Sequence, residues 1–372
     1  MPRDLPLGNG DLLVTFDARY QLRDVYFPNV GLENHTVGDV CRFGVWVDGL
    51  FSWTGDDGWE RDIRYAHETL VSEVTLGNER LGLRLRCRDA VDFDRNLYLK
   101  EVTVEDAAGR AREVRLFQHF DAHLFGNDVG DSAFYDPRTR AIVHYKGRRF
   151  FLISGVNATG DTGLESFAIG LKEANGHEGT WRDAEDGDLS RNLVAQGSID
   201  SVGMMALKIP SGGTGKATFF IAVGERYEDV RDLDKIVRER GVLSFISRTS
   251  DYWHLWANKD ESVADHLPES LCGLYKRSLL VIRTQTDNRG AIIAANDSDV
   301  LRFNRDTYSY LWPRDGALVA PAPHLPGSHA ATRRLFHPRA RPLTTAGYPP
   351  PNHHPAPPPA HPGSPSTQPP RP

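Results

Sequence analysis

Short apolar stretches separated by turn-forming residues dominate the chain from residue 11 to about residue 225. Between Leu81 and Cys87, apolar residues occupy every second position, and arginine or glycine occupies the positions between them. A period of two buries one face of a β-strand and exposes the other. Many short strands at this spacing, with no strand–helix alternation, are typical of a β-sandwich or barrel. We therefore expect a mainly β N-terminal part.

The strongest local signal is Asp48-Gly49, between the apolar runs Gly44–Val47 and Leu50–Trp53. Both residues tolerate positive φ, so this pattern predicts a tight β-hairpin. Further strands are predicted at Leu12–Phe16, Val25–Phe27, Leu97–Val104, Glu113–Phe120, Ala141–Tyr145, Phe150–Ile153, Met204–Ile209 and Ala217–Val223.

The pattern becomes helical near Glu225. Apolar residues between Asp229 and Trp256 recur at helical spacing, and Gly241 interrupts them, which predicts two short helices or one broken helix. Another helix is predicted from Pro268 to Thr286, with Pro268 in its first turn. One face of this second helix is apolar and includes Leu271, Leu274, Tyr275, Leu279 and Ile282.

The composition changes abruptly at Pro321. The last 52 residues hold 17 of the 24 prolines and five arginines, but no Lys, Asp or Glu. A segment of this kind cannot bury enough apolar surface to fold, so residues 321–372 are expected to be disordered. A stiff Pro-rich linker is one interpretation. The other is a frameshift in a GC-rich gene, which the position of the break inside a predicted helix, Asp315–Ala320, favours.

Charge and composition exclude several classes of function. The first 320 residues carry 39 basic and 50 acidic side chains, a net charge of −11. An acidic body argues against nucleic-acid and anionic-membrane partners. The start of the sequence has no apolar signal region, and Cys41, Cys87 and Cys272 are odd in number and far apart, so reduced thiols and a cytoplasmic location are expected.

The segment Tyr308-Ser309-Tyr310-Leu311-Trp312-Pro313-Arg314-Asp315 combines three aromatic residues with an Arg-Asp pair. Aromatic rings can cover the apolar face of a pyranose, while a guanidinium donates to its hydroxyls and a carboxylate accepts from them. Pro313 suits the first position of a helix. From spacing alone, an aromatic core patch beside a surface Arg–Asp pair is the favoured interpretation, because Arg-Asp dipeptides are common.

The same segment resembles the first-subsite motif of glycoside hydrolase family 15, the glucoamylase family, with the pattern Tyr, x, Tyr, x, Trp, x, Arg, Asp. The resemblance covers residues 8–320 and is to the bacterial and archaeal branch of the family. It is carried by the segments Gly8–Asp11, Val25–Pro28, Glu33–His35, Phe43–Gly49, Gly290–Ala295 and Tyr308–Asp315.

The resemblance implies an N-terminal super-β-sandwich over residues 1–225, a helical linker over 226–262 and the truncated start of an α/α toroid of six helical hairpins over 263–320. The activity implied is inverting exo-hydrolysis of α-1,4-glucosidic bonds, which releases glucose from non-reducing ends of α-glucans or maltooligosaccharides without a cofactor. Tyr308, Trp312, Arg314 and Asp315 would bind the terminal glucose. Starch dextrin, isomaltose-type dextran and trehalose all remain open as substrates.

Inverting hydrolysis requires a general acid and a general base. In the family both are glutamates from later helices of the toroid, whereas this sequence has no Asp or Glu after Asp315. No catalytic residue is therefore assigned, and the chain is expected to be inactive. Two hypotheses follow: a glycoside hydrolase truncated in this chain, or a non-catalytic β-sandwich protein with residual carbohydrate binding.

Three other groups of polar residues are possible sites. Asp297 and Asp299 are interpreted as turn residues. His119, Asp121 and His123 would share one face of a strand and are a weak candidate for a metal site, so no metal is predicted. The segment Asn127–Asp131 resembles a calcium loop only weakly because the downstream acidic ligand is absent.

Overall fold

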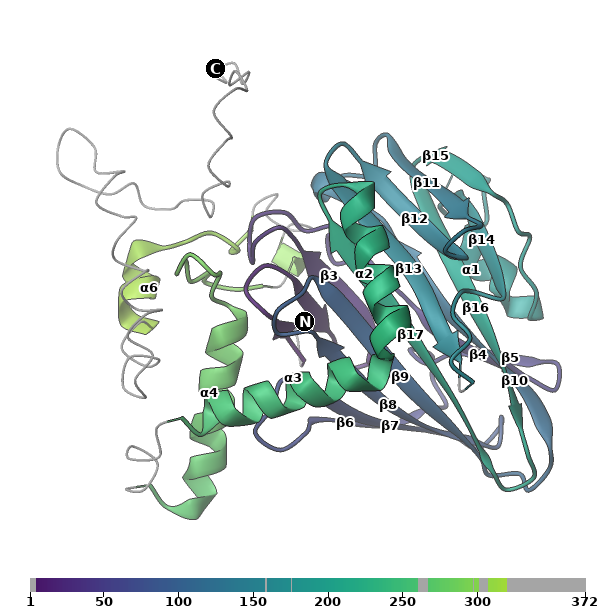
Figure 1. Cartoon of the computed structure of the whole chain (residues 1–372), viewed down its shortest axis with the longest axis horizontal. Coiled ribbons are helices and arrows are strands. Elements are labelled where there is room, and N and C mark those ends of the chain that lie inside the picture. Colours follow the sequence, from purple (N-terminus) through teal and green to yellow (C-terminus); the bar gives the residue numbers. More distant parts are fainter. Residues whose placement is uncertain are drawn as a thin grey trace.

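The computed structural model describes residues 5–319, except for residues 158, 175, 260–266, 297 and 301–306. The predicted disordered tail at 321–372, and Asp297, lie outside the described residues. The protein is mainly β, as predicted, and all pairing between its named strands is antiparallel. Its described strands form three sheets (Figure 1).

The largest sheet has nine strands in the order β15-β11-β12-β13-β17-β9-β8-β7-β6. Its bounds are β6 Glu60–Tyr65, β7 Ser72–Asn78, β8 Leu83–Val91, β9 Leu97–Asp106, β11 Asp131–Asp136, β12 Ala141–Lys146, β13 Arg149–Asn157, β15 Val194–Gly197 and β17 Thr214–Gly224. The predicted alternation is confirmed in β8, where buried and exposed residues alternate from Leu83 to Arg88.

A second sheet has five strands in the order β14-β16-β10-β4-β5. Its bounds are β4 Phe43–Val47, β5 Leu50–Trp53, β10 Arg112–Asp121, β14 Ser166–Leu171 and β16 Ile199–Ile209. The predicted β4–β5 hairpin is confirmed: Val47 pairs with Leu50, and Asp48 and Gly49 have φ of 53° and 80°. Buried side chains of this sheet and of the nine-stranded sheet belong to one apolar cluster, so the two sheets share a core.

The third sheet, β1-β2-β3, is small and consists of β1 Leu7–Gly8, β2 Leu13–Phe16 and β3 Leu22–Tyr26. Two short 3-10 turns occur among the described residues, η1 Leu124–Gly126 and η2 Ala184–Asp186. The second follows directly on the short helix α1 Thr180–Asp183. Residues of this α1–η2 segment pack against the outer face of the five-stranded sheet, where Ala184 and Trp181 meet Phe117 and Val202.

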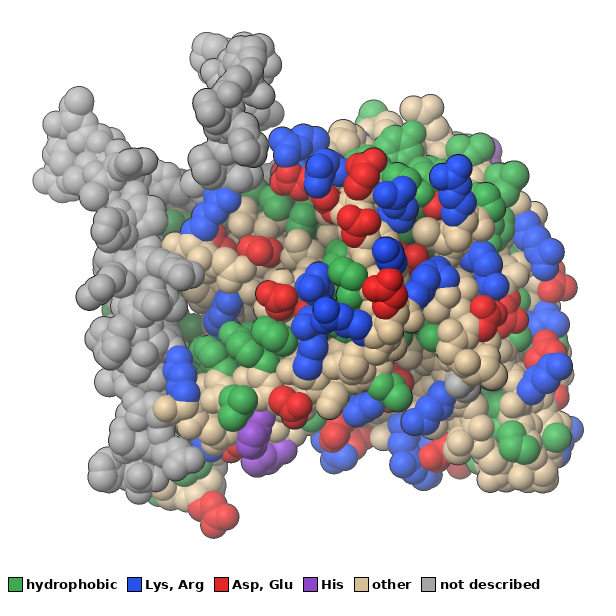
Figure 2. Space-filling model, in the orientation of Figure 1, with side chains coloured by type: hydrophobic (Ala, Val, Ile, Leu, Met, Phe, Trp, Pro, Cys, Tyr) green, Lys and Arg blue, Asp and Glu red, His purple; other side chains and the backbone are tan. Residues whose placement is uncertain are grey.

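The break predicted at Gly241 is observed. Helix α2 spans Tyr227–Arg240 and helix α3 spans Val242–Ala257, and Gly241 between them has a φ of 74°. Both helices cover one face of the nine-stranded sheet, where they bury a second apolar cluster (Figure 1). On this side of the molecule, acidic and basic side chains are interspersed (Figure 2).

Helix α4 spans Glu269–Thr284, and Pro268 is its N-cap rather than its first helical residue. The apolar face predicted for this helix is only partly buried. Leu279 is buried, but Leu271 and Leu274 are exposed. The exposed end of α4 therefore presents leucines to solvent, whereas its C-terminal half packs towards Leu70 and Trp253 through Leu280. The last described element is α6, Pro313–Val319, which begins at Pro313 as predicted.

Candidate functional site

The two chemically distinctive segments, 290–295 and 308–315, lie side by side. The N–H of Ala294 donates to the carbonyl of Tyr310 at 3.2 Å, and the N–H of Ala295 donates to the carbonyl of Tyr308 at 3.2 Å. A β-bridge joins Ile293 to Leu311. The structure therefore assembles into one unit two segments that are apart in the sequence.

This unit rests on the small β1-β2-β3 sheet. Ile293 packs with Leu13, Tyr26 and Val30 in a separate apolar cluster. The Tyr26 hydroxyl donates to the carbonyl of Asn296 at 3.1 Å. The N-terminal segment Val25–Pro28 therefore helps to support the segment 290–295 through Tyr26.

Gly31 shows how closely the two parts approach each other. Its φ is 82°, and a Cβ added there would lie 2.4 Å from Cγ2 of Ile293 and 2.6 Å from the carbonyl oxygen of Ser309. Only glycine provides both the backbone conformation and the space. Any side chain at residue 31 would push the aromatic segment away from the sheet.

Polar contacts join the same parts around Asp24. Its carboxylate accepts hydrogen bonds from the hydroxyls of Thr15 and Ser298 and from the Asn34 amide. Asp299 lies 3.5 Å from Arg23 in an ion pair, and it begins a helical segment, so its predicted turn position is wrong. Sequence reasoning missed Asp24 because nothing in its local pattern indicates contact with residue 298.

The predicted sugar-binding residues are gathered at the start of α6. Tyr308 is 47% exposed, and its ring centroid lies 6.4 Å from that of Trp312. The Trp312 Nε1 is buried and has no hydrogen-bond acceptor among the described residues. Asp315 lies half-buried in the first turn of α6. Arg314 precedes it in the helix, but its side chain lies outside the described residues.

The suggested face of His119, Asp121 and His123 does not assemble as one group. Buried His119 lies 3.1 Å from Asp200 on the neighbouring strand β16. His123 instead lies 2.7 Å from Asp39 and 3.4 Å from Asp121. Strand β10 ends at Asp121, so the alternation that would align the three residues stops before His123. Sequence reasoning missed Asp39, which lies in a loop.

The His123 environment predicts a pH-dependent stability. Burial alone would lower the pKa of His123, but Asp121 and Asp39 raise it to about 9 from an ordinary value of 6.5. Protonated His123 therefore stabilises the fold below pH 6.5, and this contribution, on the order of 2 kcal/mol, is lost as the pH rises through 9. Urea unfolding between pH 6 and 9.5 should show the decrease in the wild type and a smaller one in His123→Gln. An equal decrease in His123→Gln and in the exposed control His177→Gln would contradict this assignment.

The aspartates of the loop at 127–131 contact donor groups elsewhere in the protein. Asp131 lies 3.1 Å from Lys146 and accepts the Leu124 N–H at 3.1 Å, and Asp128 accepts the Ser198 hydroxyl at 2.6 Å. The acidic oxygens of the loop thus already contact protein donors.

The buried thiols are unsuited to nucleophilic chemistry. Burial raises the pKa of Cys87 to about 12, and it raises the pKa of Cys41 still further. Cys41 Sγ accepts a hydrogen bond from the Asp121 N–H at 3.3 Å. Cys272 lies half-buried on α4. Because a thiolate is the reactive form, Cys41 and Cys87 have structural roles.

No protein-family model matches the chain. A curated protein of Methanocaldococcus jannaschii, described as an uncharacterised glycosyl hydrolase, is 22% identical over 339 residues, which cover 89% of this chain and 52% of that protein. The chain thus spans about half the length of this relative. None of the described helices has the length and apolar character needed to cross a membrane.

Two solved structures share the fold. A bacterial glucoamylase complexed with acarbose superposes with a TM-score of 0.74 at 15% identity, covering 94% of this chain and 51% of that one. A candidate kojibiose phosphorylase from the human microbiome superposes with a TM-score of 0.56 at 10% identity, covering 91% of this chain and 46% of that one. The fold of the chain therefore corresponds to about half of each of these two proteins, and its sequence is similar to that of a protein described as a glycosyl hydrolase.

Proposed function

We propose that this chain is part of a glucoamylase-type glycoside hydrolase of family 15 and that residues 308–315 form one wall of its glucose-binding subsite. The observation that carries the proposal is the pairing of residues 290–295 with 308–311 on the β1-β2-β3 sheet. The pairing holds Tyr308 and Trp312 beside each other at the start of α6. The shared fold with a glucoamylase that binds acarbose supports the same assignment.

The roles proposed for the four residues follow from the chemistry of a pyranose. The exposed Tyr308 ring offers an apolar surface to the C–H face of the sugar. The Trp312 N–H, which has no acceptor among the described residues, can donate to a hydroxyl. Asp315 would accept hydrogen bonds from hydroxyls and Arg314 would donate to them, and such charge-assisted bonds are stronger than neutral ones.

In the proposed reaction, one carboxylic acid protonates the leaving oxygen while a second carboxylate activates water on the opposite face of the sugar. The product would be glucose released from the non-reducing end of an α-1,4-glucan with inversion. This sequence has no carboxylate side chain after Asp315. We therefore assign the acid and the base to the part of the longer relatives that has no counterpart here, and we expect this chain to bind sugar without hydrolysing it.

The domain division proposed from the sequence is retained. Residues 1–225 would form the β-sandwich, 226–262 the helical linker and 263–320 the first part of the α/α toroid, with 321–372 as a frameshifted tail. Sequencing the gene around codon 320 tests the last point, since a one-base shift should open a continuation with helical periodicity and further glutamates. A clean reading frame would contradict the frameshift.

The alternative is a non-catalytic β protein that retains carbohydrate binding, which the lack of late carboxylates favours. The two functions differ in what a restored reading frame would do. If the longer product releases glucose from maltooligosaccharides, starch dextrin, isomaltose-type dextran or trehalose, the hydrolase proposal holds and its substrate is identified. If that product binds these sugars and hydrolyses none of them, the non-catalytic function holds.

Sugar binding by the chain itself provides a direct test. Acarbose or maltotetraose should bind the wild type in isothermal titration, and Asp315→Asn should weaken binding about 10-fold because it removes a charged acceptor. Asp251→Asn, which changes an exposed aspartate on α3, is the matched control and should bind like the wild type. Equal affinities for all three proteins would exclude residue 315 from the site. Glucose release by the wild type above a mock preparation would contradict the expected inactivity.

A further inference from the structure

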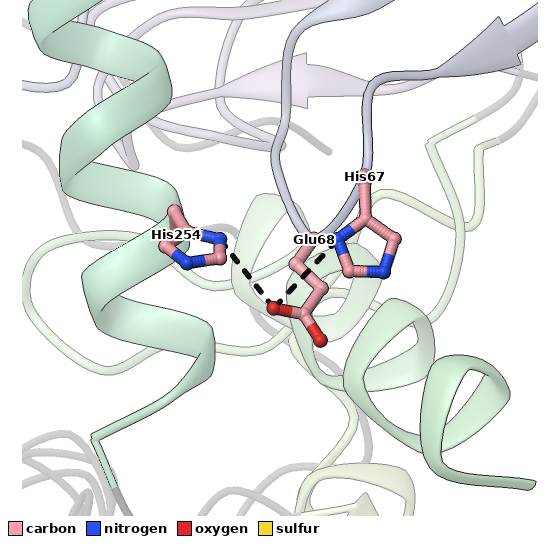
Figure 3. Close-up of side chains that lie close together, drawn as sticks. All are labelled: His67, Glu68 and His254. Atoms are coloured by element: carbon pink, nitrogen blue, oxygen red, sulfur yellow. Dashed lines mark ion pairs between the residues drawn. The ribbon is translucent and has the colours of Figure 1, made fainter. Parts of the chain in front are cut away.

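A group of three potential metal ligands lies away from residues 308–315, where the turn between β6 and β7 meets α3 (Figure 3). His67 and Glu68 come from the turn, and His254 comes from the last turns of the helix. Nδ1 of His254 lies 3.4 Å from Oε2 of Glu68, and Nδ1 of His67 lies 3.9 Å from the same oxygen. All three ligand atoms lie within 4.8 Å of one another.

These separations approach those of a tetrahedral zinc site. Zn²⁺ binds imidazole nitrogen at about 2.0–2.1 Å and carboxylate oxygen at about 2.0–2.2 Å, which places neighbouring ligands roughly 3.3 Å apart. The His254–Glu68 pair is already at that distance. The His67 side chain is 85% exposed, so its ring can move the remaining ~0.6 Å towards Glu68, and also towards His254, without disturbing packing.

Two neighbours hold the central carboxylate in place, one at each oxygen. Lys276 donates to Oε1 of Glu68 at 2.6 Å, and the Asn258 amide donates to Oε2 at 2.6 Å. Asn258 also accepts from Lys276 at 2.6 Å, which links the two supports. Outer partners of this kind orient metal ligands and tune their affinity.

The turn that carries His67 and Glu68 is also fixed through its backbone. Arg277 of α4 donates to the carbonyl of Thr69 at 2.7 Å and to that of Ala66 at 3.3 Å. Its guanidinium lies 3.9 Å from the ring centroid of Tyr65. Glu68 itself adopts a left-handed φ of 54°, an uncommon conformation for this residue type. The turn is therefore held in a defined geometry before any ligand binds.

We propose that His67, Glu68 and His254 bind Zn²⁺ and that the ion ties the β6–β7 turn of the nine-stranded sheet to α3. Two imidazoles and one carboxylate match the ligand preference of zinc, and the fourth position would hold water. The ion would link a turn to a helix at the surface of the protein. Mg²⁺ is a poor alternative because it prefers oxygen ligands.

The second group of ligand atoms, Asp39, Asp121 and His123, is less suitable for a metal. Asp121 already lies 2.5 Å from Lys172, and His123 is paired with both carboxylates. A metal would have to displace the lysine and a proton from His123. In the proposed site, by contrast, Lys276 contacts the Glu68 oxygen that does not face the histidines, and the oxygen that faces them accepts a neutral amide N–H from Asn258.

Thermal unfolding of the full chain with ZnCl2 tests the proposal. An ion that bridges two elements of the native fold stabilises it, so saturating Zn²⁺ should raise the wild-type Tm, on the order of 3 °C, and EDTA should reverse the rise. His67→Ala and His254→Ala should keep the Tm measured without zinc and lose the zinc-dependent rise. Both side chains are mainly exposed, so neither change should prevent folding.

The matched control is His177→Ala, which changes an exposed histidine outside both groups and should retain the full rise. Total zinc bound is not diagnostic, because six histidines lie in residues 321–372. If zinc leaves the wild-type Tm unchanged, the proposal is overturned. It is also overturned if the rise is equal in all four proteins, or if Mg²⁺ produces the same rise as Zn²⁺.

Discussion

Replacing Lys100 with methionine is expected to lower the free energy of unfolding by about 3–5 kcal/mol, because it leaves a buried carboxylate without its counter-ion. Lys100 and Asp89 are 2% and 0% exposed, and Nζ lies 2.9 Å from Oδ1. The Lys100 ammonium also lies over the Tyr20 ring, 3.9 Å from its centroid. Methionine keeps most of the side-chain volume, so the loss should report the charge rather than a cavity.

The Asp89 carboxylate is also held by three hydroxyls, those of Tyr20, Ser72 and Tyr98. These donors remain in Lys100→Met, and they would all lose their acceptor in Asp89→Ala, which we expect to be the more damaging change. Lys216→Met, at an exposed position of β17, is the control and should stay within about 0.5 kcal/mol of the wild type. Urea unfolding followed by tryptophan fluorescence gives the comparison. Equal midpoints for the two lysine variants would show that the buried pair is not needed.

A chain that ends at Gly224 is expected to aggregate, whereas one that ends at Asn258 should remain folded and soluble. Helices α2 and α3 bury five apolar side chains in the cluster on the nine-stranded sheet: Val230, Val237, Val242, Phe245 and Ile246. At about 1.5–3 kcal/mol each, this burial contributes roughly 8–15 kcal/mol, which is comparable to the whole stability of a typical domain.

The sequence alone suggests a different cut, near Val223, because it predicts that the apolar face of the helix from Pro268 would be left without partners. The structure supports part of that expectation, since Leu271 and Leu274 are exposed on α4. It also shows that α2 and α3 must be kept. Soluble yield, ANS fluorescence and cooperative unfolding of the two shortened chains and the full chain are the measurements. If the chain ending at Gly224 matches the one ending at Asn258, the packing argument is wrong.

Local chemistry explains which elements could be predicted. The Asp48-Gly49 turn, the alternation in β8 and the helix break at Gly241 depend on residues adjacent in sequence, and all three are observed. Strand β6 was missed because it is an edge strand in which half-buried and exposed residues alternate and charges outnumber apolar side chains. Its pairing with β7, and not its own composition, makes it a strand.

In the candidate site, too, some features could be predicted from the local sequence and others could not. The aromatic segment at 308–315 was identified from residue types and from its resemblance to glucoamylases, and the sugar-binding roles of its residues remain a proposal. Its support by Tyr26 and Gly31 involves residues about 270 positions apart, which no local pattern encodes. Its pairing with 290–295 joins residues 13 to 18 positions apart. The proposed zinc ligands are similarly distant, because His254 is brought to Glu68 only when α3 packs on the sheet.

By itself, the sequence determined that the chain is mainly β with helices after residue 225 and that no carboxylate follows Asp315. Periodicity and turn chemistry depend on residues that are close in sequence, so they can be recognised without knowledge of the tertiary structure. Only the tertiary structure decided which polar groups meet. It placed His123 beside Asp39 rather than His119, and Lys100 beside Asp89. Burial and ion pairing depend on distances in space, and those distances exist only once the sheets and helices have packed.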